Sequence, residues 1–142
     1  MAAFGGSAAA GADDTQPTLE ETYDYPDAAK ILHDRKIRLI RGDGHIVLVD
    51  CAPGANVLRV QSRITKPNED FCFQVKRAPG YVTLELEKAY YVRGDNHVVD
   101  ATVTTEGHSE TVPVRKNEWT EIGEITDPEG RPGTLVELRA KA

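Results

Sequence analysis

The stretch YVTLELE, residues Tyr81–Glu87, decides the fold class of this chain. Hydrophobic and polar side chains alternate along it, so Val82, Leu84 and Leu86 point to one face of a strand and the residues between them point to the other. The segment His97–Thr105 repeats the same alternation. A period of two residues is typical of a β-strand with one face in the protein core and one face in water.

Other segments of the chain are also short and rich in β-branched and aromatic residues. Clusters of Gly, Pro, Asn and Asp separate them, as expected for turns. The additional strands that we expect are Ile37–Arg41, His45–Asp50, Val57–Ile64, Phe71–Lys76, Glu110–Val114 and Thr134–Ala140. Many short strands at this spacing indicate a sandwich or an open barrel, and we predict an all-β fold, an antiparallel β-sandwich.

One short helix is expected before the first strand. Pro26 suits the first helical position, and Asp27 suits the positive end of the helix dipole. The residues at i, i+3, i+4 and i+7 from Ala28 form a narrow, largely apolar stripe. We therefore predict a helix that begins at Pro26, ends near Lys36 and lies against the sheet.

The first 22 residues differ in composition from the rest of the chain. Ala and Gly dominate this segment, and Phe4 is its only large side chain before Leu19. Such a segment cannot bury enough apolar surface to offset the entropy lost on ordering it. We predict a flexible, acidic arm over residues 1–22 and one β-sandwich domain over residues 23–142. Small side chains would let the arm enter a narrow cleft of a partner, where Phe4 would fill a pocket.

The net charge of −6 is concentrated near the N-terminus. Six of the 23 acidic residues precede Lys30, and no Lys or Arg accompanies them. The acidic residues that remain are balanced by the 17 Lys and Arg. Nucleic acids and anionic membranes require a basic surface, so we expect neither as a partner. No apolar run approaches the ~20 residues needed to cross a bilayer.

The chain contains two cysteines, Cys51 and Cys72, and both lie in apolar, strand-like surroundings. An even number of cysteines in a small, loop-rich β protein suits a disulfide formed in an oxidising compartment. Two buried thiols are the alternative. The spacing is not Cys-x-x-Cys, so neither redox catalysis nor a zinc site is indicated. We predict a disulfide between the two residues.

The sequence contains no recognisable catalytic or metal-binding motif. Its histidines lack the spacing of metal ligands and belong to no HExxH-type motif. They are His33, His45, His97 and His108. Ser109 follows a histidine directly, but neighbouring side chains on a strand point to opposite faces. Glu85 and Glu87 share a strand face, which we expect to be solvated. We expect no catalytic residue, no metal and no cofactor.

Two Arg-Gly-Asp tripeptides and one tryptophan are the remaining candidates for recognition. The tripeptides, 41–43 and 93–95, each begin a tight turn, where Gly and Asp serve the backbone, so we favour that role over cell adhesion. Trp119 has polar neighbours along the chain. We interpret it as a lid on the core and keep a binding hot spot as the alternative.

Several segments, taken in order, resemble a family of small exported actinobacterial proteins. These segments are Tyr25–Leu32, Arg41–Cys51, Phe71–Phe73, Gly80–Glu85, Asn117–Trp119 and Leu135–Arg139. The resemblance covers roughly residues 23–140, and its specificity lies in the order of the segments. Within this family the chain is most similar to the adaptor subunits of umbrella toxin particles, which are antibacterial assemblies secreted by filamentous actinobacteria.

The resemblance implies a secreted, non-catalytic adaptor between protein partners. Such an adaptor bridges a helical-repeat scaffold subunit and a trypsin-like or lectin-bearing subunit, and its N-terminal segment inserts into the cleft of the trypsin-like domain. The arm residues that would make this contact are Phe4, Gly5, Gly6, Ala8, Ala9 and Ala10.

Two other functions remain open at this point. A secreted protease inhibitor needs a rigid exposed loop, for which Pro128–Pro132 or the segment between the cysteines would serve. A carbohydrate-binding module needs a coplanar platform of aromatic side chains.

Overall fold

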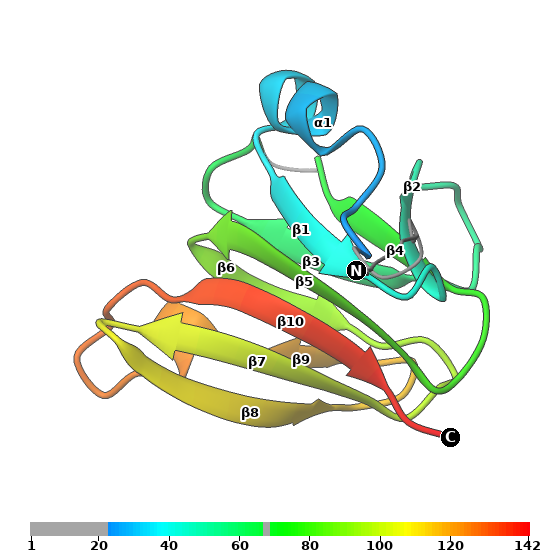
Figure 1. The fold of residues 1–142 in the computed structure, drawn as a ribbon. Coiled ribbons are helices and arrows are strands. Elements are labelled where there is room, and N and C mark those ends of the chain that lie inside the picture. Colours follow the sequence, from blue (N-terminus) through cyan, green and yellow to red (C-terminus); the bar gives the residue numbers. More distant parts are fainter. Residues whose placement is uncertain (1–22, 67–68) are drawn as a thin grey trace, which may run out of the picture.

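Two antiparallel sheets pack face to face in the computed structural model of the protein, which describes residues 23–66 and 69–142 (Figure 1). The all-β sandwich with one short helix is therefore confirmed. The first sheet contains, in spatial order, β1 (Arg38–Gly42), β5 (Gly80–Glu87), β10 (Thr134–Ala140), β7 (Val99–Thr105) and β8 (His108–Val114). The second contains β2 (Ile46–Val49), β4 (Phe71–Val75), β3 (Leu58–Ser62), β6 (Ala89–Arg93) and β9 (Trp119–Glu121).

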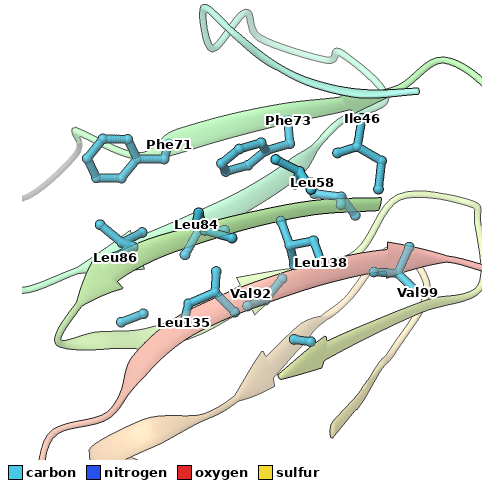
Figure 2. Close-up of a cluster of buried hydrophobic side chains, with 14 of the residues drawn as sticks. Ile46, Leu58, Phe71, Phe73, Leu84, Leu86, Val92, Val99, Leu135 and Leu138 are labelled. Carbon is cyan, nitrogen blue, oxygen red and sulfur yellow. The ribbon is translucent and has the colours of Figure 1, made fainter. Parts of the chain in front are cut away.

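The core lies between the two sheets and is built from alternate residues of their strands (Figure 2). Leu84 and Leu86 point inward from β5, and each is at most 1% exposed. Phe71 and Phe73 face them from β4 and are equally buried. The alternation predicted along Tyr81–Glu87 is therefore confirmed. Burial of such side chains contributes about 1.5–3 kcal/mol each, so these four residues make a large contribution to the stability of the domain.

The sequence pattern missed two strands, β6 and β9. Only Lys88 separates β6 from β5, and it adopts a left-handed backbone conformation with φ of 56°. At this residue the chain turns from the first sheet into the second, so one stretch of sequence without a Gly or Pro break contains two strands in different sheets. β9 spans only three residues, which is too short for its alternation to be recognised.

The helix α1 spans Ala28–Arg35 and lies beside β1 at one end of the sandwich (Figure 1). The prediction that it begins at Pro26 is wrong, because Asp27 has a φ of 58° and interrupts the helical backbone before Ala28. Its apolar stripe is half-buried, and no residue of the helix is fully buried.

The segment before α1 joins the edges of both sheets. The amide of Tyr25 donates to the carbonyl of Ile40 in β1 at 3.0 Å, and its hydroxyl accepts the amide hydrogen of Leu48 in β2 at 2.8 Å. The edges of β1 and β2 are thus held together through one tyrosine.

Both Arg-Gly-Asp tripeptides form corners where the chain passes from one sheet to the other. In each corner a histidine stands two residues after the aspartate, and its backbone amide donates to the aspartate side chain. The distances are 3.0 Å from His45 to Asp43 and 2.8 Å from His97 to Asp95. A Cβ at Gly94 would lie 2.2 Å from the carbonyl oxygen of Arg115. The backbone role predicted for the tripeptides is therefore confirmed.

The predicted disulfide is also confirmed, with the Cys51 and Cys72 Cα atoms 5.3 Å apart. Cys72 lies on β4 with no exposed surface, whereas Cys51 is exposed in the segment after β2. The bond closes a covalent loop over a sequence separation of 21 residues and joins the β2–β3 connection to β4, an inner strand of the second sheet.

We expect the double variant Cys51→Ala/Cys72→Ala to lose about 3 kcal/mol of unfolding free energy, because the open chain gains entropy in the unfolded state. Urea denaturation followed by circular dichroism measures this loss. A reductant should destabilise the wild type by a similar amount and leave the double variant unchanged. Equal stability of the wild type with and without reductant would contradict the prediction.

We expect Asp95→Ala to lower the unfolding free energy by about 1.5–3 kcal/mol. The carboxylate has no exposed surface and accepts the amide of His97 as well as pairing with its Nδ1 at 2.8 Å, so its removal leaves buried polar groups without a partner. Asp50→Ala, an identical substitution at an exposed position after β2, is the matched control for urea denaturation. Equal losses in the two variants would refute the structural role of Asp95.

Candidate protein-binding face

The outer side of the second sheet carries aromatic and arginine side chains over β3, β6 and β9. We call this surface the aromatic–arginine face. It comprises Arg59, Gln61, Tyr91, Arg93, Trp119 and Glu121, with Tyr90, Arg63 and Arg115 at its border.

Strand alternation places these side chains on the outside. Val60, Val92 and Thr120 are buried and point between the sheets, so the residues on either side of them point outward. Cross-strand pairing then arranges the outward residues in two rows, of which Arg59–Arg93–Trp119 is one. The second row is Gln61–Tyr91–Glu121.

The aromatic rings of this face are in contact but tilted. The ring centroids of Tyr91 and Trp119 lie 5.8 Å apart with their planes at 62°, and those of Tyr90 and Tyr91 lie 5.3 Å apart at 57°. Edge contacts of this kind stabilise the cluster itself. The rings do not form the coplanar platform that stacking against a sugar requires.

An open depression of about 450 Å³ lies over the second row of the face. Its lining combines two aromatic rings with an amide, a carboxylate and a guanidinium, from Tyr91, Trp119, Gln61, Glu121 and Arg115. Such a surface offers both apolar contact area and directional hydrogen bonds, which is the composition of the energetically important centre of many protein interfaces.

The arginines of the face differ in their partners. Arg59 pairs with Asp70 at 3.5 Å. Arg63 pairs with Glu124 at 3.0 Å while its guanidinium lies 4.3 Å from the ring centroid of Tyr90. Arg93 forms no ion pair with any residue of the described part of the chain.

Arg115 likewise forms no ion pair within residues 23–66 and 69–142; its guanidinium donates to the backbone carbonyl of Trp119. No carboxylate of these described ranges therefore neutralises Arg93 or Arg115.

The interpretation of Trp119 as a lid on the core is wrong. Its side chain is half-buried on the outer side of β9, and the neighbouring Thr120 is the residue that points inward. Its adjacency to Tyr91 and Arg93 arises only when β9 pairs with β6, which the sequence pattern did not reveal. The signal that could have indicated β6 is the β-rich run Tyr90-Tyr91-Val92.

The other sequence-derived candidates do not gather at one place. The arm residues Phe4, Gly5, Gly6, Ala8, Ala9 and Ala10 lie outside the described residues. Glu85 and Glu87 are exposed on the outer side of the first sheet, as expected. Among the residues that the structure describes, no group of three or more His, Cys, Asp or Glu side chains could hold a metal ion.

The loop after β9 contains one of the segments considered for protease inhibition. The carboxylate of Asp127 accepts the amide hydrogens of Glu129 and Arg131 at 2.9 and 3.0 Å and pairs with the Arg131 guanidinium at 3.0 Å. Arg131 also contacts Glu106 at 3.3 Å. These contacts cross-link the loop, and carboxylates of the protein itself hold its basic side chain.

No protein-family model matches the chain, and a search of curated proteins finds no matching relative. Within the described ranges, none of the helices has the length and hydrophobicity that crossing a membrane would require.

We expect Asp127→Asn to destabilise the domain at pH 7, with the deficit shrinking as the pH falls below about 4. The Arg131 guanidinium and two backbone amides hold the pKa of Asp127 well below its ordinary value. A depressed carboxyl pKa contributes stability above the unfolded-state pKa, and this contribution is lost as the pH falls through the folded-state pKa. Urea denaturation midpoints at pH 7 and pH 3 measure the effect. Arg131→Gln should show the same dependence, and a deficit equal at both pH values would contradict it.

Proposed function

We propose that this protein is a non-catalytic, secreted adaptor that holds two protein partners together in an antibacterial toxin complex. The folded domain binds one partner through the aromatic–arginine face. The arm, residues 1–22, engages the other partner. The observation that carries the proposal is the concentration of Trp119, Tyr91 and Arg93 on one outer face of the sandwich.

Side-chain type supports a protein partner at this face. Trp, Tyr and Arg are the residues most enriched among binding hot spots, because each provides a large contact area with a polar group at its end. Trp119 is the only tryptophan of the chain, and it is half-buried on the surface although a core position would bury more of it.

The disulfide supports secretion. Disulfides form and persist in oxidising environments outside the cytosol, and small exported domains use them to supplement a limited hydrophobic core. The Cys51–Cys72 bond anchors an exposed connection to a buried strand, which is such a use.

The family resemblance supports the identity of the partners. The adaptors that the chain resembles link a helical-repeat scaffold subunit to a trypsin-like or lectin-bearing subunit. We assign the helical-repeat subunit to the aromatic–arginine face. The arm residues Phe4–Ala10 would enter the cleft of the trypsin-like domain.

The two rival functions have less support. The tilt of 62° between Tyr91 and Trp119 is unfavourable for stacking against a flat sugar ring. Engagement of Arg131 by Asp127 and Glu106 leaves that loop without a free basic side chain for a trypsin-like protease to bind.

We expect deletion of residues 2–18 to abolish co-purification with the trypsin-like subunit while leaving the fold and the helical-repeat interaction intact. Trp119→Ala should give the reverse pattern, with a loss of affinity for the helical-repeat subunit of about 2 kcal/mol or more. Each purified subunit is tested separately by isothermal titration calorimetry, and circular dichroism verifies the fold of each variant.

The matched control is Tyr81→Ala, because Tyr81 is a half-buried aromatic residue beneath an arginine on the outer side of the other sheet. It should bind both subunits normally. Undiminished binding of the trypsin-like subunit after the deletion would refute the role of the arm, and undiminished binding of the repeat subunit by Trp119→Ala would refute the role of the face.

A further inference from the structure

Two arginines occupy directly opposite positions on the aromatic–arginine face. Arg59 of β3 and Arg93 of β6 are Cα partners in the antiparallel ladder, and both point outward. Side chains in this relation have Cβ atoms about 4.5–5.5 Å apart, and like charges there repel each other. Asp70 forms an ion pair with Arg59 and none with Arg93, so no carboxylate of the described residues pairs with Arg93.

A third guanidinium lies at the free edge of β9. The carbonyl of Glu118 accepts the amide of Gly94, and the amide of Ile122 donates to the carbonyl of Tyr90, so both groups point toward β6. Alternation in an antiparallel ladder then directs the carbonyl of Trp119 away from β6, and this carbonyl accepts the Arg115 guanidinium. Arg93 and Arg115 thus flank Trp119 from opposite sides.

The charge of the face is opposite in sign to that of the whole chain. The face and its border contain four arginines, at positions 59, 63, 93 and 115, and one acid, Glu121; we count with them Asp70 and Glu124, the ion-pair partners of Arg59 and Arg63. They carry one positive charge in excess, on a chain whose net charge is −6. The excess is located at the two arginines that have no acidic partner within the described ranges.

We propose that the surface that docks on the aromatic–arginine face is an acidic segment of a partner protein. Its carboxylates pair with Arg93 and Arg115, and apolar side chains between them cover Tyr91 and Trp119. This inference rests on the proposed adaptor function and specifies the chemistry of the partner that the face binds.

Guanidinium chemistry favours a carboxylate at these positions. An arginine presents a planar fork of donors that matches the two oxygens of a carboxylate, and such pairs are stronger than neutral hydrogen bonds. Contact with Trp119 and Tyr91 excludes water around the pairs, which strengthens them further. A basic partner would instead add to the existing repulsion between Arg59 and Arg93.

The single tryptophan provides a direct measurement, because the intrinsic fluorescence of Trp119 reports only on this face. We would titrate the full chain at low salt with a short Trp-free peptide of Glu, Gly and Leu. Matched peptides carry Gln or Lys in place of Glu. The Glu peptide should give a saturable change in Trp119 emission, the Gln peptide should bind at least about tenfold more weakly, and the Lys peptide should not bind.

The double variant Arg93→Gln/Arg115→Gln should weaken binding of the Glu peptide about tenfold or more. Arg38→Gln/Arg139→Gln removes the same charge from ion pairs with Glu85 and Glu137 outside this face, and it should bind like the wild type. Equal binding of the Glu and Gln peptides, or equal losses in the two double variants, would overturn the inference. Tighter saturation of the Trp119 signal by heparin than by the Glu peptide would also overturn it, in favour of an anionic glycan.

Calorimetry with the repeat subunit separates this inference from the proposed function. If Trp119→Ala loses the subunit but Arg93→Gln/Arg115→Gln retains full affinity, the face binds its partner and the acidic character of that partner is refuted. If both variants lose affinity and the loss in the arginine variant disappears at high salt, the acidic partner is supported.

Discussion

The contact between Leu84 and Leu86 of one sheet and Phe71 and Phe73 of the other is the interaction on which the rest of the structure depends (Figure 2). Burial of these side chains fixes which residues of each strand point inward, and the period of two then fixes which point outward. A shift of β6 by one residue would exchange Val92 with one of its neighbours and move Tyr91 or Arg93 into the core. The aromatic–arginine face is therefore a consequence of the core packing on its opposite side.

The long strands were predictable from the sequence because hydrophobic and polar residues alternate along five or more positions in them. The aromatic–arginine face was not, because two of its three strands, β6 and β9, were not recognised in the sequence. No Gly or Pro marks the end of β5, yet the left-handed backbone conformation of Lys88 separates β5 from β6. Trp119 lies in a strand of only three residues and has polar neighbours along the chain. Its position beside Arg93 results from the pairing of β9 with β6, which the sequence pattern does not reveal.

The two Arg-Gly-Asp corners impose a second constraint, which acts on the path of the backbone between the sheets. Asp43 and Asp95 accept amide hydrogens immediately before the chain enters the next sheet, and Gly94 allows the backbone to approach Arg115 closely. The strand that ends in Arg93 is thereby tied to the segment that carries Arg115. The backbones that carry the two arginines are thereby packed together beside Trp119. Under the proposed function, such an arrangement would favour binding without reorganisation of the face.

Under the proposed function, the edge strands β8 and β9 favour recognition through side chains over strand addition. Strand addition requires unpaired amide and carbonyl groups along an exposed edge. At the edge strand β9, Arg115 already occupies the carbonyl of Trp119. At the edge strand β8, Pro113 provides no amide hydrogen. A partner that approaches the second sheet at β9 would therefore make its contacts above the sheet, on the rings of Tyr91 and Trp119 and on the guanidinium groups beside them.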